Sequence, residues 1–193
     1  DINITTVGNG DEDDGILIQD TSQISLKEIF INDVRGNGVE FRINTSQITA
    51  NNIIIDDADN DGILLSEGTT NGIFEDIIIL NSARTRDWGV FCDLRNGEFC
   101  KNITFDNLSI FGGDAQDGFR VESGEEITIK NSYLNEIGNG GGDYGIEIIG
   151  GNQINISNIL INDTRDDGIN IFDTVSNINL ENINIIDNLG SAI

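Results

Sequence analysis

The sequence of 193 residues contains no histidine, and this absence removes several kinds of active site. Without histidine the chain lacks the usual base at neutral pH, the Ser-His-Asp triad and the histidine ligands of zinc sites. Basic residues are also scarce, with 10 Lys and Arg against 34 Asp and Glu, so the formal net charge is −24. That charge disfavours nucleic acid and anionic membrane surfaces, and it leaves cations, basic proteins and neutral or cation-bridged glycans as candidate partners.

Long apolar runs are missing as well. The sequence has no stretch of about 18 apolar residues that would insert into a membrane, and no basic-then-apolar leader. Its hydrophobic content is nevertheless 37%, dominated by isoleucine in a strict period, unlike the apolar-poor chains that stay disordered. We therefore expect a folded chain, of a length that suits one domain.

One glycine recurs through the whole sequence and divides it into units of 22 to 29 residues. The recurring positions are Gly15, Gly38, Gly62, Gly89, Gly118, Gly145, Gly168 and Gly190. Each unit carries three short stretches of alternating apolar residues, the period of a strand with one buried face. In the unit that begins at Asp167, these stretches start at Ile169, Ile178 and Ile183. Three aligned columns predict a solenoid of about seven to eight coils, with three parallel sheets around one core.

The recurring pattern I-x-I-x-N-I-x-I, with a following D-G-I, resembles the repeats of right-handed parallel β-helices in the pectate-lyase-like superfamily. The resemblance covers essentially the whole chain and implies an all-β, right-handed parallel β-helix, with residues 1–193 as a single domain. It leaves function open, because this architecture occurs in lyases, hydrolases, epimerases, phage tailspikes and non-catalytic surface proteins. The Gly-His-Gly element of polygalacturonase-like hydrolases is absent, as is the Tyr-Gly-Phe-Asp-Pro-His site of alginate epimerases.

Asparagine and aspartate are concentrated in two columns of the repeat. The first column precedes the third stretch, at a bend that favours residues tolerant of left-handed backbone, and we interpret it as scaffold. The second column precedes each glycine and would stack carboxylates about 5 Å apart, an arrangement that favours bound Ca²⁺. Its candidate metal ligands are Asp14, Asp61, Asp117 and Asp167. The alternative is that these are solvated turns, in which Asp and Gly serve the backbone.

Arg120 is the candidate catalytic residue if the chain is an enzyme. The resemblance implies a β-elimination, in which Ca²⁺ held by carboxylates acidifies a sugar proton and an Arg or Lys removes it. The period of two turns Arg120 outward, and Asp87 and Asp117 would lie near it. The alternative is that Arg120 forms a cross-strand ion pair with Glu147.

The longest units, with spacings of 27, 29 and 27 residues, surround Arg120 and predict a glycan-binding patch. Trp88, Tyr144 and Asp143 would form it, since an aromatic residue beside carboxylates suits a sugar ring. The alternative for Trp88 is that it caps a loop.

The two cysteines lie close together in the sequence. Cys92 falls in an inward column and Cys100 ends the excursion that covers residues 93–100. A disulfide between Cys92 and Cys100 would close that excursion and indicate an oxidising compartment, whereas the alternative is a buried free thiol.

The outward positions of the third stretch form an apolar stripe, defined by Phe30, Ile54, Ile78, Tyr133 and Leu160. Contiguous apolar surface of this kind usually marks an interface, although a loop of the same chain would cover it equally well. Both ends of the sequence align with the middle of a coil, with no amphipathic capping helix. We therefore expect part of a longer solenoid, or copies stacked end to end.

Taken together, these features predict a non-enzymatic structural protein of the extracellular space or cell surface, such as a filament or adhesin segment that associates with itself. The alternative function is a Ca²⁺-dependent polysaccharide lyase or a glycan-binding β-helix.

Overall fold

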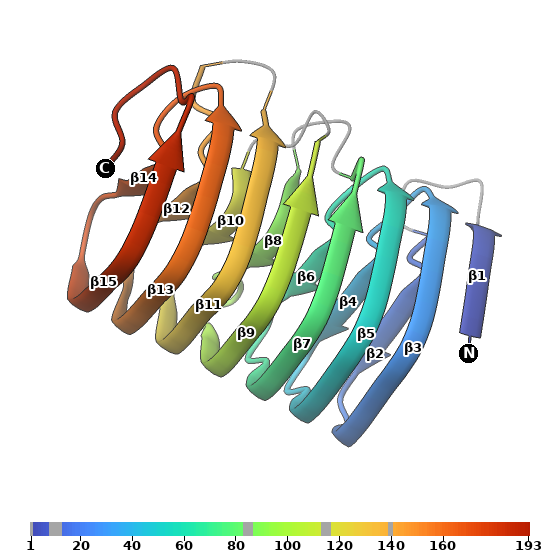
Figure 1. The fold of residues 1–193 in the computed structure, drawn as a ribbon. Helices are drawn as coiled ribbons and strands as arrows, with labels where there is room; N and C mark the ends of the chain where they lie inside the picture. The colour runs from blue at the N-terminus through green and yellow to red at the C-terminus, as the bar shows by residue number, and fades with distance from the viewer. Residues whose placement is uncertain (1, 8–12, 83–86, 113–116, 139–140) are drawn as a thin grey trace.

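The computed structural model describes residues 2–7, 13–82, 87–112, 117–138 and 141–193. Over these residues the chain forms strands and turns without a helix, and the strands wind into a parallel solenoid of about seven coils (Figure 1). The predicted all-β solenoid is thereby confirmed. The described residues include no helix long and apolar enough to span a bilayer.

Two parallel sheets run along the solenoid, and each strand pairs with its equivalent in the next coil. The long strands form sheet A: β1 (Ile2–Val7), β3 (Ser22–Val34), β5 (Ser46–Ala58), β7 (Thr70–Leu80), β9 (Cys100–Phe111), β11 (Gly124–Ile137), β13 (Gly151–Thr164) and β15 (Val175–Ile186). The short strands form sheet B: β2 (Ile16–Gln19), β4 (Val39–Arg42), β6 (Ile63–Leu65), β8 (Trp88–Cys92), β10 (Asp117–Val121), β12 (Ile146–Ile148) and β14 (Ile169–Ile171).

The structure has two sheets where the sequence predicted three, because the second and third apolar stretches belong to one continuous strand of sheet A. That strand bends at the predicted asparagine column, where every residue has a positive φ between 53° and 59°. The column contains Glu28, Asn52, Asp76, Asn107, Asn131, Asn158 and Asn182. Left-handed backbone turns the chain at this point, while parallel pairing continues on both sides.

The side chains at this bend also bond along the solenoid. Asn107 Nδ2 donates to Asp76 Oδ1 at 2.7 Å, and Asn158 Nδ2 donates to Asn131 Oδ1 at 3.1 Å. Asn182 repeats the bond to Asn158 one coil later, at 3.0 Å. The prediction that this column is scaffold is therefore confirmed.

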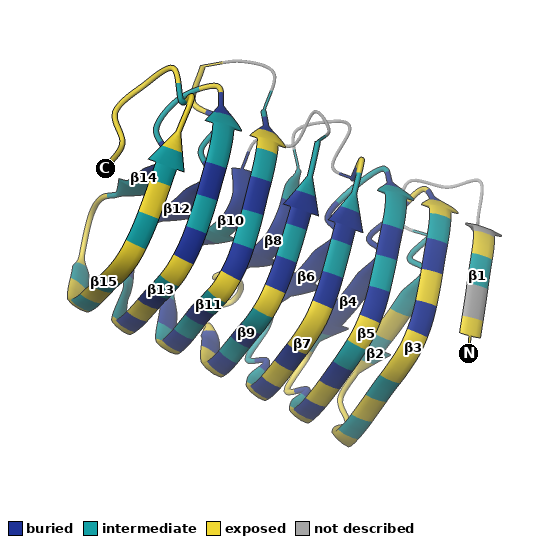
Figure 2. Ribbon diagram, in the orientation of Figure 1, coloured by how far each residue is buried: buried dark blue, intermediate teal, exposed yellow. Residues whose placement is uncertain are grey.

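The core lies between the two sheets and is filled by the inward columns of both (Figure 2). Four phenylalanines pack through its middle, and successive ring centroids are 5.6, 4.6 and 5.1 Å apart. They are Phe41, Phe74, Phe105 and Phe119, all buried. The isoleucine columns of successive coils pair in the register that the sequence predicted, with Ile31, Ile55 and Ile79 as one example.

Cys92 and Cys100 are free, buried thiols in the structure, in place of the predicted disulfide. The Cys100 Sγ lies 3.3 Å from the carbonyl oxygen of Leu65, to which it donates. Burial raises the pKa of the Cys100 thiol, and the neighbouring Cys92 raises it further. Both cysteines are thus buried free thiols, the alternative to the disulfide, and they act as small apolar core residues.

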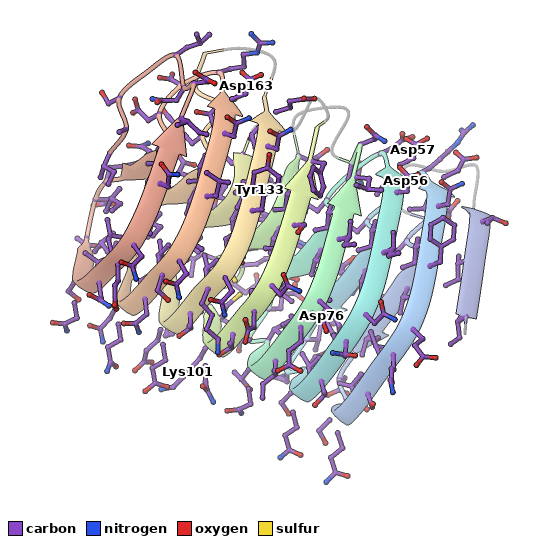
Figure 3. All side chains as sticks on the ribbon, viewed as in Figure 1. Asp56, Asp57, Asp76, Lys101, Tyr133 and Asp163 are labelled. Carbon is purple, nitrogen blue, oxygen red and sulfur yellow. The ribbon has the colours of Figure 1, made fainter. Side chains whose placement is uncertain are left out.

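The apolar stripe lies on the outer face of sheet A, where Figure 3 labels Tyr133. Its members occupy one register column, which Ser109 interrupts between Ile78 and Tyr133. Phe30 is exposed, and the others are half-buried by their neighbours along the column. The predicted position of the stripe is thus confirmed, and its role as an interface stays a prediction.

Candidate functional site

The outward face of sheet B, called the groove below, is partly covered by side chains, and a cavity lies over one part of it. One outward column runs through every coil of this sheet and contains Leu17, Glu40, Leu64, Phe91, Arg120, Glu147 and Asn170. Glu40 and Glu147 are only 5% and 4% exposed although they point away from the core. Side chains from the flanking turns therefore cover the floor of this face.

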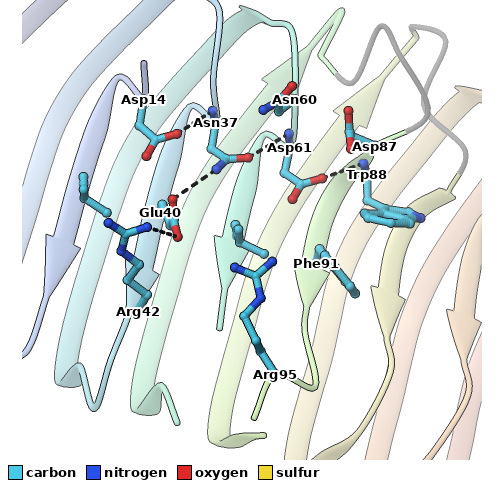
Figure 4. Close-up of a pocket in the computed structure, with 12 residues that line it drawn as sticks. Asp14, Asn37, Glu40, Arg42, Asn60, Asp61, Asp87, Trp88, Phe91 and Arg95 are labelled. Atoms are coloured by element: carbon cyan, nitrogen blue, oxygen red, sulfur yellow. Dashed lines mark hydrogen bonds and ion pairs between the residues drawn. The ribbon is translucent and has the colours of Figure 1, made fainter. Parts of the chain in front are cut away.

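One part of the groove is a cavity of about 310 Å³ over the coils of β2 to β8 (Figure 4). A row of carboxylates lines one side, and Trp88 and Phe91 close one end. The lining carboxylates are Asp14, Glu40, Asp61 and Asp87. Arg42 and Arg95 extend toward this row from the other side (Figure 4).

The aspartates that precede the repeated glycines bond to the backbone of the next coil. Asp61 Oδ1 accepts from the Trp88 N–H at 2.8 Å, and Asp117 Oδ1 accepts from the Tyr144 N–H at 2.9 Å. The same contact joins Asp14 to the Asn37 N–H, Asn37 to the Asp61 N–H, and Asp167 to the Ser191 N–H. One oxygen of each predicted metal ligand thus serves the scaffold, as the alternative interpretation of this column expected.

No group of three or more acidic or cysteine side chains within the described parts of the chain is arranged to hold a metal ion. Calcium binding at Asp14, Asp61, Asp117 and Asp167 stays a prediction.

Glu40 lies at the centre of the carboxylate row. It accepts a hydrogen bond from Asn37 Nδ2 at 3.3 Å, and Arg42 Nη1 lies 3.5 Å from its Oε1. Burial and, next to it, Asp14 together raise the pKa of Glu40 to about 7, against the opposing effect of Arg42. The pKa of Asp61 is also raised by burial, and Asp87 adds to that effect. Glu40 and Asp61 therefore hold protons at a higher pH than ordinary carboxyl groups do.

Arg120 lies beyond Trp88, in the next part of the groove. The sequence predicted its outward position beside Glu147, and the strand register confirms it, with Phe91 as the neighbour in the preceding coil. The guanidinium bonds to Glu147 and lies 3.5 Å from Asp117 Oδ2 and 3.3 Å from Glu122 Oε1. Three carboxylates therefore engage this guanidinium, and the ion pair with Glu147 is the one that the alternative interpretation of Arg120 expected.

The guanidinium of Arg120 also stacks on aromatic rings. Its Cζ is 4.9 Å from the centroid of Trp88 and 5.9 Å from that of Phe91. The two rings contact each other with centroids 4.2 Å apart at an interplanar angle of 43°. A cation over an aromatic face is stabilised by the electrons of the ring, so Trp88 and Phe91 hold Arg120 in place.

Asp117 is the most buried carboxylate of this part of the groove, with 1% of its surface exposed. Burial, with a smaller contribution from the charge of Glu147, raises the pKa of Asp117 to about 7 against the opposing effects of the Tyr144 N–H and Arg120. Within the described residues, Asp117 Oδ2, Trp88 Nε1 and Arg120 Nε are buried without a well-formed hydrogen bond. Asp117 Oδ2 nevertheless lies 3.5 Å from Arg120 Nη1, and Trp88 also interacts with the Asp117 carboxylate, so the three side chains contact one another within the cluster.

The remaining predicted site residues are less favourably placed for contact with a ligand. Asp143 is only 6% exposed and packs closely beneath Gly138. Tyr144 is half-buried, and burial raises the pKa of its hydroxyl, with Asp166 the next contributor. Asp87 lines the cavity instead of joining Arg120.

The sequence analysis missed Glu40, Phe91 and Arg95 as groove residues. Glu40 and Phe91 share the outward column of Arg120, and that shared column is the signal that would have found them. Arg95 comes from the excursion after β8 and carries no such signal.

Comparison with solved structures finds the same kind of solenoid in proteins of very different sequence. A variant of the catalytic domain of GH87 α-1,3-glucanase, in complex with nigerose, is similar with a TM-score of 0.50 and 11% identity. The fold is that of a parallel β-helix. The match covers 97% of this chain and 53% of that one, so the chain spans about half the length of the glucanase domain.

PfbA, a surface adhesin of Streptococcus pneumoniae, is similar with a TM-score of 0.43 and 11% identity, over 96% of this chain and 76% of that chain. No protein-family model and no curated protein matches the sequence.

Proposed function

We propose that the protein binds a glycan chain in the groove on the outward face of sheet B. The observation that carries the proposal is the Trp88–Phe91 pair, which lies between two sets of carboxylates on the floor and wall of the groove. Sugar recognition combines an apolar platform for the ring with polar groups that bond to hydroxyls, and this groove offers both.

The size of the groove supports the same function. Its cavity of about 310 Å³ falls at the lower end of the roughly 300–1,000 Å³ typical of small-ligand sites. Because the outward column continues along every coil of sheet B, a polymer would contact repeated positions rather than a single pocket. A glycan ligand also agrees with an extracellular or cell-surface location, which we propose together with it.

Cleavage of the bound glycan is the second candidate function. Glu40 and Asp117 have pKa values of about 7, which allow a carboxyl group to donate or accept a proton at neutral pH. A β-elimination would use Arg120 as the base, with Asp117 and Ca²⁺ beside it, whereas Asp87 lines the cavity instead. The guanidinium of Arg120 is already engaged by three carboxylates, so acid–base chemistry by Glu40 or Asp117 is the better supported form.

A structural role through self-association is a third candidate, and the apolar stripe on sheet A supports it. This role is compatible with glycan binding, because the stripe and the groove belong to different sheets.

Trp88 is the only tryptophan, so its fluorescence reports directly on the groove. We expect a panel of soluble oligosaccharides to contain ligands that shift this emission with saturable binding. Phe91→Ala should weaken that binding about tenfold, equal to about 1.4 kcal/mol. Phe30→Ala is the matched control, since it removes a phenylalanine from the outer face of sheet A.

The absence of any saturable ligand would overturn the proposed function, and so would an equal loss of affinity in the Phe30→Ala control. The same mixtures should be assayed for new reducing ends and for unsaturated products. Reducing ends that disappear in Asp117→Asn, without loss of binding, would establish hydrolysis as the second function. Unsaturated products that disappear in Arg120→Ala would establish the lyase instead.

A further inference from the structure

Asparagine followed by glycine is the dipeptide that most readily loses its side-chain amide. The backbone nitrogen of the glycine attacks the side-chain carbonyl carbon of the asparagine, and the amide leaves as ammonia together with the proton of the attacking nitrogen. Water then opens the cyclic imide to aspartate, or to isoaspartate, in which the main chain runs through the side-chain carbonyl. Glycine favours the attack because it has no Cβ to obstruct the ring. The reaction consumes only water.

The sequence contains five Asn–Gly pairs, and the structure describes three of them. The pairs are 9–10, 37–38, 71–72, 96–97 and 139–140, of which the first and the last lie outside the described residues. Reaction in a folded chain needs water, a glycine N–H that no acceptor holds, and a backbone that can deform into the ring. The three described pairs differ in how far they meet these requirements.

The pair at Asn37 is held on every side by the solenoid. Asn37 is only 7% exposed, and its Oδ1 accepts from the Asp61 N–H at 3.1 Å. The Gly38 N–H donates to the carbonyl oxygen of Asp61 at 2.9 Å. The attacking nitrogen and the carbonyl that it would attack are therefore both engaged by the next coil.

The pair at Asn71 lies inside β7, between two neighbouring strands. Gly72 is buried and pairs with Ile48 on one side and with Ile103 on the other. The Asn71 side chain is exposed, but its Oδ1 accepts from Asn102 Nδ2 at 2.8 Å. Closure of the ring here would pull the strand out of the sheet.

The pair at Asn96 forms the exposed turn of a hairpin in the excursion after β8. Arg95 and Glu98 form an antiparallel bridge, and the Glu98 N–H donates to the Arg95 carbonyl oxygen at 3.0 Å. Asn96 and Gly97 have φ values of 57° and 78°, as in a tight hairpin turn. Among the described residues the Gly97 N–H donates to no acceptor, and no atom lies within 4 Å of a Cβ built at Gly97. This pair meets all the requirements.

We infer that Asn96 is a site of spontaneous modification, at which the folded protein converts asparagine to aspartate and isoaspartate while Asn37 and Asn71 stay intact. The inference is independent of the proposed glycan binding.

The modification changes how the hairpin is held. Asn96 Nδ2 donates to Glu67 Oε1 at 3.2 Å, which ties the excursion to the preceding coil. A carboxylate at residue 96 would be repelled by Glu67 instead. Isoaspartate also lengthens the main chain of the turn, which disfavours the bridge between Arg95 and Glu98. Arg95 lines the cavity of the groove, so the modification loosens the segment that holds this arginine there.

The experiment incubates the folded chain at mildly alkaline pH, digests samples taken over time and follows each Asn–Gly peptide by mass spectrometry. We expect the Asn96 peptide to convert at least about tenfold faster than the Asn37 and Asn71 peptides, which corresponds to about 1.4 kcal/mol of activation free energy. In urea that unfolds the chain, the three peptides should convert at similar rates. Asn96→Gln should abolish conversion at this position, because glutamine would have to close a larger ring.

Equal conversion of the three peptides in the folded chain overturns the inference, and so does an Asn96 peptide that converts only in urea. Asn96→Asp tests the effect on the hairpin, since it introduces the charge without lengthening the main chain. Hydrogen exchange of residues 93–99 should be faster in this variant than in the parent. Asn179→Asp, at an exposed position of β15, is the matched control and should leave that exchange unchanged. Equal exchange in Asn96→Asp and the parent would overturn the loosening of the hairpin by charge.

Discussion

Glu40 and Asp117 are carboxyl groups that the fold keeps away from water at the outward face of a sheet. The removal of a carboxylate from water favours its neutral form, and the neighbouring acids Asp14 and Glu147 act in the same direction. Arg42 and Arg120 reduce the effect without reversing it. The folded protein therefore binds protons that the unfolded chain releases.

This difference predicts how stability depends on pH. The pKa of Glu40 is about 7 in the folded state against an ordinary value of 4.5, so the folded state holds more protons between these two values. Stability from this group is fully present below about pH 4.5 and is lost as the pH rises through 7. We expect the free energy of unfolding in urea to fall from pH 5 to pH 8, with Glu40 contributing roughly 1–3 kcal/mol of the fall.

Glu40→Gln should remove that contribution, so its stability should depend less on pH and exceed that of the parent at pH 8. Glu181→Gln is the control, and it should keep the pH dependence of the parent. An unchanged slope in Glu40→Gln would show that this carboxyl is ionised in the folded protein throughout the range.

At the scale of the strand, the repeat made most of the architecture predictable. A period of two identifies which side chains enter the core, and the glycine spacing shows which residues of successive coils are equivalent. The outward position of Arg120 and the register of Cys92 therefore followed from the sequence. The bend at the asparagine column was equally visible. Whether strands on both sides of a bend belong to one sheet depends on hydrogen bonding through the bend, and periodicity does not report that.

The groove was harder to predict for a related reason. Alternation tells that Glu40 and Phe91 point away from the core, but the burial of these side chains depends on the turns that flank sheet B. Those turns differ in length from coil to coil, so no periodic signal describes them. For the same reason the sequence did not show that one oxygen of each of these aspartates bonds to the backbone of the next coil, which is a contact in three dimensions.

The repeated glycines begin the strands of sheet B and lie where successive coils come closest. A Cβ at Gly62 would lie 2.6 Å from the carbonyl oxygen of Gly89 and 2.7 Å from Ile79 Cγ2. In Gly62→Ala, either the backbone at Gly89 or the side chain of Ile79 must therefore move away from the new methyl group. We expect this variant to be less stable than the parent by about 1–3 kcal/mol. Urea unfolding followed by circular dichroism measures the effect.

Gly141→Ala is the matched control, since no atom lies within 4 Å of the added Cβ. It should leave the unfolding midpoint unchanged or raise it slightly, because alanine reduces the freedom of the unfolded chain. Equal midpoints for the two variants would mean that the coils separate at Gly62 without cost.

At the scale of the whole molecule, two properties oppose each other. The net charge of −24 makes copies of the chain repel one another, whereas the apolar stripe of Phe30, Ile54, Ile78, Tyr133 and Leu160 favours their contact. Repulsion between exposed charges extends over the Debye length, which falls from about 30 Å at 0.01 M salt to about 8 Å at 0.15 M. Contact between apolar side chains is short-ranged and is not screened by salt.

Self-association through the stripe should therefore increase with salt. We expect sedimentation to show monomers at about 0.01 M NaCl and larger species at about 0.15 M and above, because screening removes the repulsion first. Ile54→Lys should keep the protein monomeric at every salt concentration, since it places a charge in the middle of the stripe. Ile73→Lys is the control: Ile73 is 48% exposed on the same sheet but outside the stripe, so this variant should associate as the parent does. A parent that stays monomeric at high salt and high concentration would contradict the interface, and the stripe would then be an apolar surface without a copy of the same chain as its partner.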